Sequence, residues 1–477
     1  MAASKSDSFK HVNFQLPDVE KATLFNIIKD LVFSTNVNHR WIITISIFIQ
    51  ILLKRYLAYP LKIFGSLIED LLNGNIFLRK KEGWVEENGH GFISFIGQID
   101  SRMELNKDIK HGDARYYPAL SMMASKLVYE NEHVIQTIVS RLWKMEHVKF
   151  YDCYNDYQKK RTTEAFIMRE ETEEDDKIIV AFRGTSPFDA DDWSTDFDYS
   201  WCNIHGMGKT HMGFMVALGL KRYNNYDDNE NINCDFPKQI EQDPERPLAY
   251  YVIRDKLKEI MANNNNNKNK RVKFIMTGHS LGGALAILFP ALLALHGEVD
   301  LLNNLEVVYT FGQPRVGNEQ FGQFMKIILR EHKIKYYRIV YGYDIVPTVP
   351  LDNTFMTFKH FGTSIHFNAL YRGKIVEEEQ QKAVKKGVKK YLKNLRGIVM
   401  ITMECILARL TALLEFIRGF IIGFIAGPYY REGWLLICFR SFGILFPGVV
   451  NHNPQDYVNA TTFASPDLFE YHPATNT

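Results

Sequence analysis

The residues best suited to chemistry in this sequence surround Ser280, in the segment TGHSLGG at 277–283. An apolar stretch at 272–277 leads into this segment, and an Ala- and Leu-rich stretch follows from Ala284. Gly-x-Ser-x-Gly between a strand and a helix predicts a sharp, strained turn that exposes the serine hydroxyl above a helix N-terminus. Because that terminus offers unpaired N–H groups and positive partial charge, we predict that Ser280 is a nucleophile. The alternative is a glycine-rich turn that only ends a strand.

A serine nucleophile needs a base, and the base needs a carboxylate that orients it. In hydrolases built on this turn, the acid and then the base follow the serine along the chain. Asp344 fits the acid because it lies just past an apolar stretch at 337–341, although an Asp in this context can also simply form a turn. Spacing alone leaves the base open among four histidines: His360, His366, His452 and His472. We interpret His279, next to the nucleophile, as structural.

The surrounding sequence predicts the elements that must position these groups. Apolar stretches that end at turn signals predict strands at 177–182, 272–277, 307–311 and 337–341. Helix-like stretches lie at 248–261, 284–296 and 318–331. This alternation predicts a mostly parallel sheet with both faces covered by helices. Two Asn-rich stretches, 224–246 and 263–270, are predicted to be exposed loops.

Length and composition indicate a globular protein with one large domain and appended segments, or two domains. The 477 residues are 46% hydrophobic and 23% charged, and the net charge of +2 gives no reason to expect a nucleic-acid partner. Five scattered cysteines show no zinc-like spacing. They predict reduced, buried thiols and weakly favour a cytosol-facing location.

Two apolar stretches outside the predicted sheet are candidates for lipid contact. Residues 41–53 would extend about 20 Å as a helix, short of the roughly 30 Å hydrocarbon core, so we expect an interfacial or re-entrant segment rather than a span. Residues 398–426 place most of their polar side chains along one narrow stripe of a helix. Such a helix could lie in a lipid interface or pack against residues 41–68, and the alternative is a buried helix in a large core.

The chain resembles the class 3 lipases, and within them the plant oil-body triacylglycerol lipases. Four places carry the resemblance: AFRGT at 181–185 with PFDADDW at 187–193; TGHSLGG at 277–283; YTFGQPRVGN at 309–318 with DIVPTVP at 344–350 and FKHFG at 358–362; and 446–459, which contains HNPQDY. Together these places span roughly residues 110–465. The apolar N-terminal stretch also resembles that plant subgroup.

The resemblance implies an α/β-hydrolase fold with a mostly parallel central sheet, together with apolar helical segments that associate with membrane on the N-terminal side and before the C-terminus. It implies a catalytic triad of Ser280, Asp344 and His452, with His360 as a structural residue outside it. The oxyanion hole is expected to use the backbone N–H of Leu281 and the backbone N–H and hydroxyl of Thr185. Thr185 could instead only form a turn. Arg183 is expected to brace this loop through a carboxylate, and residues 187–193 are expected to form a lid.

We expect an N-terminal region at 1–115, with a lipid-associating segment at about 41–78 and a polar linker at 79–115. A lipase domain follows at 116–477, with an apolar helical insertion at about 397–448. The resemblance implies a triacylglycerol lipase that releases free fatty acids through an acyl-enzyme, on the cytosol-facing surface of lipid droplets (oil bodies) or on the endoplasmic reticulum membrane. The expected partner is lipid, and the mechanism requires no metal or organic cofactor. The alternatives are a phospholipase or galactolipase on the same scaffold, and a non-catalytic lipase-like scaffold protein.

Overall fold

The structure is a computed structural model that describes residues 48–74, 92–172, 175–187, 189, 200–223, 233–241, 243–265, 270–350, 357–376 and 395–470. Several sequence-based predictions lie wholly or largely outside these ranges. They concern the lid, residues 224–232 of the first Asn-rich stretch, residues 266–269 of the second, and the first half of the apolar stretch at 41–53.

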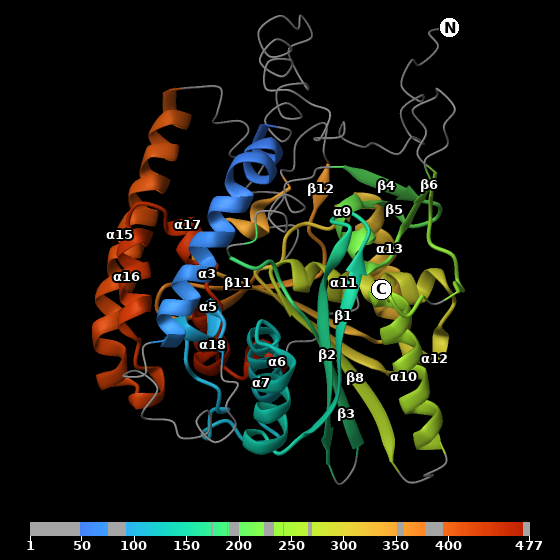
Figure 1. Cartoon of the computed structure of the whole chain (residues 1–477). Helices are drawn as coiled ribbons and strands as arrows, with labels where there is room; N and C mark the ends of the chain where they lie inside the picture. Colours follow the sequence, from blue (N-terminus) through green and yellow to red (C-terminus); the bar gives the residue numbers. More distant parts are fainter. Residues whose placement is uncertain are drawn as a thin grey trace, which may run out of the picture.

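An eight-stranded sheet forms the centre of the molecule, in the order β1-β2-β3-β8-β9-β11-β13-β14 (Figure 1). The strands are β1 (Glu146–Asn155), β2 (Lys160–Glu171), β3 (Asp175–Phe182), β8 (Arg271–His279), β9 (Leu305–Phe311), β11 (Lys335–Tyr341), β13 (Thr363–Phe367) and β14 (Gly373–Val376). Neighbours from β3 to β13 are parallel, whereas β1, β2 and β14 are added antiparallel at the edges. The four strands predicted from sequence all fall in the parallel block, and each is two or three residues longer than its apolar stretch.

Helices cover both faces of the sheet because alternate side chains of a strand point to opposite faces. In β3, Ile178 and Val180 belong to one buried cluster, and Ile179 and Ala181 belong to the other. The first cluster includes α9 (Met212–Leu218), α10 (Ala249–Asn265), α11 (Leu281–Leu295) and α13 (Glu319–Glu331). The second includes α6 (Tyr116–Leu127), α7 (Glu132–Thr137) and α18 (Pro454–Phe463).

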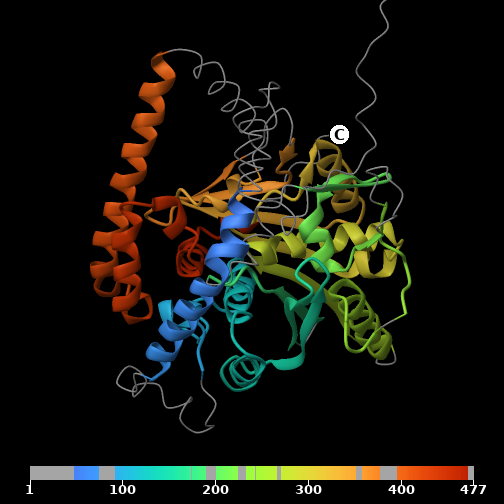
Figure 2. The same cartoon turned by 45° about the horizontal axis from the view of Figure 1, so that its top comes forward.

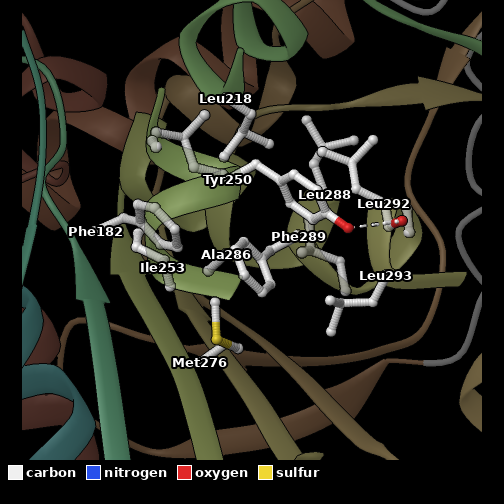
Figure 3. Close-up of a cluster of buried hydrophobic side chains, with 14 of the residues drawn as sticks. Phe182, Leu218, Tyr250, Ile253, Met276, Ala286, Leu288, Phe289, Leu292 and Leu293 are labelled. Atoms are coloured by element: carbon white, nitrogen blue, oxygen red, sulfur yellow. Dashed lines mark hydrogen bonds between the residues drawn. The ribbon is translucent and has the colours of Figure 1, made fainter. Parts of the chain in front are cut away.

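Figure 3 shows the first cluster, in which side chains of α10 and α11 pack over β3 and β8. The hydroxyl of Tyr250 in α10 donates a hydrogen bond to the Leu292 carbonyl of α11 at 3.2 Å. The hydroxyl of a fully buried tyrosine therefore has a partner, so its ring can pack in the core without an unsatisfied polar group. This packing fixes α11, whose first turn follows Ser280, against the sheet.

A group of helices stands beside the sheet (Figures 1 and 2). It consists of α15 (Leu395–Ile425), η5 (Pro428–Tyr430), α16 (Trp434–Gly443) and α17 (Pro447–Val450), and it joins β14 to α18 in the sequence. On the N-terminal side, η1 (Leu52–Leu57) and α3 (Ala58–Gly74) form a further helical segment. Within the described part of the chain, no helix is both long and apolar enough to cross a membrane.

Shorter elements complete the described fold. A four-stranded sheet has the order β12-β10-β5-β4, and a two-stranded sheet pairs β6 with β7. Their strands are β4 (Trp201–Ile204), β5 (Gly208–His211), β6 (Lys221–Tyr223), β7 (Asn233–Asp235), β10 (Gly317–Asn318) and β12 (Phe358–Lys359). The short helices are α5 (Phe95–Ile99), η3 (Ile138–Leu142), α12 (Val299–Asn304), η4 (Val346–Thr348) and α19 (Asp467–Glu470).

Three expectations from the sequence were wrong. The two Asn-rich stretches were expected to be exposed loops, but the first contains β7 and the buried Phe236, which packs in the first buried cluster, and residues 263–265 of the second belong to α10. The cysteines were expected to be buried, but Cys405 in α15 and Cys438 in α16 are exposed, because these helices present part of their apolar surface to the outside. Residues 79–115 were expected to form a linker, but the described part from 92 onward packs into the body. There Asp100 pairs with the buried Lys126 of α6 at 3.2 Å, and Met103 belongs to the second buried cluster. The domain boundary at residue 115 stays a prediction.

Candidate active site

Ser280 forms the whole turn between β8, which ends at His279, and α11, which begins at Leu281. Its backbone has φ 58° and ψ −130°, a conformation that residues other than glycine rarely adopt. A Cβ on Gly278 would lie 2.1 Å from the backbone of Gly282, and a Cβ on Gly282 would lie 2.1 Å from the carbonyl oxygen of Phe182. Both glycines are therefore required by close backbone approach, and the strained strand-to-helix turn predicted from the sequence is confirmed.

A continuous chain of hydrogen bonds joins Ser280, His452 and Asp344. The Ser280 hydroxyl lies 2.8 Å from Nε2 of His452, and Nδ1 of His452 lies 2.7 Å from Oδ2 of Asp344. Ser280 and Asp344 are buried, with 3% and 4% of their surface exposed. His452 is contributed by the segment between α17 and α18, 172 residues from Ser280 in sequence. The three residues predicted as a triad thus meet at hydrogen-bonding distance, which is the geometry that proton transfer requires.

The other candidate histidines have different surroundings. His360 donates from Nε2 to the carbonyl oxygen of Pro347 at 2.6 Å, which fits the structural interpretation. His366 lies in β13, where burial, with Arg338 nearby, lowers its pKa to about 4. His472 lies outside the described residues.

His279 supports the segment that carries His452. Its Nε2 donates to the carbonyl oxygen of His452 at 3.0 Å, so its Nδ1 accepts from the Tyr129 hydroxyl, also at 3.0 Å. The two imidazole rings have centroids 4.5 Å apart. Burial holds the pKa of His279 well below its usual value, so this ring stays neutral beside the proposed base. His279 is structural, as predicted from the sequence, but the structure adds a specific contact with the base.

Tyr457, in α18, is a further member of the site that sequence reasoning missed. Its hydroxyl donates to Oδ2 of Asp344 at 2.5 Å, and the backbone N–H of Val346 donates to Oδ1 at 2.9 Å. Burial and the neighbouring Asp344 raise the pKa of Tyr457 well above its usual value, so it remains a donor. Tyr457 belongs to the HNPQDY segment used for the resemblance, and that segment was the only signal in the sequence that could have pointed to it.

Gly312, just after β9, leaves space for the Asp344–His452 pair. It has φ 59°, and a Cβ at this position would lie 2.9 Å from Oδ2 of Asp344 and 2.9 Å from Nδ1 of His452. A larger residue would be strained in this backbone conformation and would also push apart the two groups that must stay hydrogen-bonded.

Of the two predicted oxyanion donors, Leu281 directly follows the nucleophile and Thr185 directly follows a glycine that packs against it. Leu281 is the first residue of α11, so its N–H has no acceptor within the helix. Thr185 is buried and follows Gly184, where a Cβ would lie 3.1 Å from Cβ of Ser280. Nη1 of Arg183 donates to the carboxylate of Glu164 at 2.5 Å, which is the bracing contact expected from the sequence. The oxyanion role itself stays a prediction.

A parallel sheet that carries a strained serine turn, with the serine hydrogen-bonded through a histidine to an aspartate, is the arrangement found in serine hydrolases. The family model described as lipase (class 3) matches residues 179–354, which include Thr185, Ser280 and Asp344. The chain is 37% identical to triacylglycerol lipase OBL1 from Nicotiana tabacum, over 89% of this chain and 83% of that protein. It is also 37% identical to triacylglycerol lipase OBL1 from Arabidopsis thaliana, over 89% and 85%.

The chain therefore belongs to the class 3 lipase family and is a carboxylic ester hydrolase. Among solved structures it is similar to lipase II from Rhizopus niveus, with 21% identity, a TM-score of 0.36, and coverage of 54% of this chain and 82% of that one. The family, the sheet order and the Ser280 turn together identify the fold as an α/β-hydrolase fold.

Proposed function

We propose that this lipase hydrolyses the acyl esters of triacylglycerol at the surface of lipid droplets and releases free fatty acids. The observation that carries the proposal is the hydrogen-bonded chain from Ser280 through His452 to Asp344. The substrate class is supported by the relatives named as triacylglycerol lipases, which align with most of this chain.

In the proposed mechanism, His452 Nε2 takes the proton of Ser280 as the serine oxygen attacks an acyl carbonyl carbon. Asp344 accepts the hydrogen bond from Nδ1, which fixes the imidazole tautomer and stabilises its positive form. The N–H groups of Leu281 and Thr185, with the Thr185 hydroxyl, stabilise the oxyanion of the tetrahedral intermediate. The protonated His452 then donates its proton to the departing glycerol oxygen. A water molecule, activated by the same imidazole, cleaves the acyl-enzyme and frees the fatty acid.

The N-terminal helices support a location on lipid. On α3, large apolar side chains are exposed: Tyr59, Phe64, Leu67 and Leu71 are 76%, 55%, 62% and 66% exposed. An apolar surface of this kind on a helix is typical of a segment that lies in a lipid interface. Deletion of residues 41–68 is therefore expected to release the protein from the floating lipid layer, and unchanged flotation would contradict this part of the proposal.

The substrate is tested by measuring fatty-acid release from emulsions of triolein, phosphatidylcholine and a monogalactosyl lipid at equal acyl-ester concentration. We expect triolein to be hydrolysed fastest by the wild-type protein, and the Ser280→Ala variant to lose several orders of magnitude of activity. Faster release from phosphatidylcholine or the galactolipid would replace the proposal with a phospholipase or galactolipase. If fatty acid were released from none of the three emulsions, the result would favour a non-catalytic scaffold protein.

A further inference from the structure

The outer surface of the C-terminal half of α15 has the reverse of the pattern expected for a helix in contact with water, whereas the N-terminal half exposes the charged Glu404 and Arg409. Between residues 410 and 425, every exposed side chain is Leu, Ile or Phe, and Phe424 and Ile425 are 90% and 78% exposed. The charged side chains in the same stretch, Glu415 and Arg418, are only 2% and 7% exposed. A water-facing helix places its charges outside and its apolar side chains inside, so this half of the helix is suited to an apolar medium.

Exposed apolar side chains extend from α15 toward the proposed catalytic residues. α15 packs against α16, and α16 packs against α17, on one side of the molecule (Figures 1 and 2). Around α17, Leu445 and Phe446 are 65% and 52% exposed. Ile345, next to Asp344, is 51% exposed, and its N–H donates to the carbonyl of Gly448 in α17 at 3.1 Å. The apolar surface therefore reaches the loop that carries the proposed catalytic acid.

The chemistry of this surface favours lipid over protein as its occupant. Protein interfaces combine an apolar centre with a polar rim and about one hydrogen bond per 100–200 Å². Along residues 410–425 the exposed side chains provide no hydrogen-bonding group, whereas acyl chains require none. The surface also adjoins a site whose proposed substrate is a lipid ester.

We propose that α15, together with α16 and α17, binds a lipid surface, and that this binding holds Asp344 and His452 in their hydrogen-bonded geometry. The second half of the statement rests on the proposed function, because it assumes that these two residues act as acid and base. The lipid surface is a phospholipid monolayer over neutral lipid. The alternative is that a second copy of this chain covers the apolar surface of α15.

Glu415, on the inner side of α15, contacts the segments that carry Asp344 and His452. Its carboxylate accepts from Nδ2 of Asn451 and from the hydroxyl of Tyr341, each at 2.8 Å. Asn451 directly precedes His452, and its Oδ1 accepts from the N–H of Tyr343, which directly precedes Asp344, at 2.9 Å. One carboxylate on the lipid-facing helix therefore positions the segment of the base and, through Asn451, the loop of the acid.

Arg418, one turn further along α15, makes a second connection. Its guanidinium donates to Asp456 at 2.9 Å, and Arg440 of α16 donates to the same carboxylate oxygen at 2.9 Å. Asp456 directly precedes Tyr457, which donates to Asp344. Because a buried charge that loses its partner is strongly destabilising, α15 and α16 cannot shift without moving α18 with them. Movement of α15 on lipid is thus transmitted to both sides of the triad.

Binding of α15 to lipid is tested with the double variant Phe424→Ser/Ile425→Ser in the full-length protein. The matched control is Ile327→Ser in α13, where an isoleucine is 46% exposed on a different element. Flotation with triolein droplets coated by phosphatidylcholine gives the partition coefficient. Burial of each side chain in hydrocarbon raises the partition coefficient about tenfold or more. We therefore expect the partition coefficient of the double variant to fall about 100-fold and that of the control to change less than twofold. Unchanged partition of the double variant, or a change only in oligomeric state, would overturn the proposal.

Coupling is tested by hydrolysis of a monomeric short-chain ester, p-nitrophenyl butyrate, with and without phosphatidylcholine vesicles. Vesicles are expected to raise the kcat of the wild type and of Ile327→Ser, but not that of Phe424→Ser/Ile425→Ser. Glu415→Gln, which retains the shape of the side chain, is expected to lower kcat about tenfold while KM and flotation stay unchanged. Stimulation that survives in the double variant, or normal kcat in folded Glu415→Gln, would refute the coupling. Absence of ester hydrolysis by the wild type would instead refute the proposed function.

Discussion

The contact between Tyr457 and Asp344 gives a prediction whose size can be worked out from the structure. The phenol donates to the buried carboxylate at 2.5 Å, and the carboxylate oxygen that accepts it is the same one that accepts from His452. A hydrogen bond to a charged group contributes about 1.5–3 kcal/mol. Asp344 keeps its bond from the N–H of Val346 when the phenol is removed, so we take the lower half of that range. At about 1.4 kcal/mol per factor of ten, Tyr457→Phe should lower kcat by about 10- to 40-fold.

The assay is steady-state hydrolysis of p-nitrophenyl butyrate from pH 5 to pH 9, with the folded fraction measured in parallel. KM should stay within about twofold, because Tyr457 acts through Asp344 and not on the substrate. Removing a donor from the carboxylate strengthens its attraction for the imidazolium, so the acidic limb of the kcat/KM profile should move to higher pH. Stability should fall by about 1–3 kcal/mol, since the N–H of Tyr341, 3.3 Å from the phenol oxygen, loses its acceptor.

Tyr116→Phe is the matched control for this experiment. The Tyr116 hydroxyl also donates to a carboxylate, that of Glu170, at 2.5 Å, but it connects α6 with β2 and does not contact the triad. We expect this variant to lose stability without a change in kcat or in the pH profile. An unchanged kcat in Tyr457→Phe, or a loss of kcat equal to that of the control, would refute the positioning role of Tyr457.

Three further predictions test other parts of the account. In Gly312→Ala the new methyl group would lie 2.9 Å from the ring of His452, so we expect kcat to fall about 100-fold in a folded protein; kinetics that match the wild type would contradict this. Asp456→Asn removes the carboxylate that pairs with the buried Arg418 and one of the two carboxylates that pair with Arg440, the other being Glu432, and should lower the free energy of unfolding in urea by about 3–5 kcal/mol; a loss below about 1 kcal/mol would show that these ion pairs matter little. Burial lowers the pKa of His211 to about 3, so folding favours the neutral ring, and this contribution to stability is lost as pH falls from about 6.5 toward 3. The wild type should therefore lose up to about 1.4 kcal/mol more per pH unit than His211→Asn, and parallel stability profiles in urea titrations would rule this out.

The parts of the fold that were predictable from sequence are those specified by local patterns. The four parallel strands are short, almost wholly buried apolar stretches, and the glycines around Ser280 are required by contacts within the turn itself. β1 was not predicted because it lies at the edge of the sheet, where its buried and exposed residues alternate irregularly and carry several charges. A partly exposed edge strand has no clear apolar pattern to read.

The parts of the site that could not be predicted are formed by residues distant in sequence. Spacing left the base open among four histidines, and the resemblance selected His452. Tyr457 was missed because its function depends on meeting Asp344, 113 residues away. On α15 the sequence indicated a polar stripe but not which way it faces. Glu415 and Arg418 turn inward because their partners, Asn451 and Asp456, lie 36 and 38 residues further along the chain.

The central claim, that Ser280 is a nucleophile activated by His452, is tested most directly by reaction with a fluorophosphonate probe and mass spectrometry of the labelled peptide. The account predicts one covalent adduct per chain on Ser280 in the wild type, none in Ser280→Ala, and labelling slowed by at least about 100-fold in folded His452→Ala. A stoichiometric adduct on a different serine, or ester hydrolysis that persists in Ser280→Ala, would contradict it.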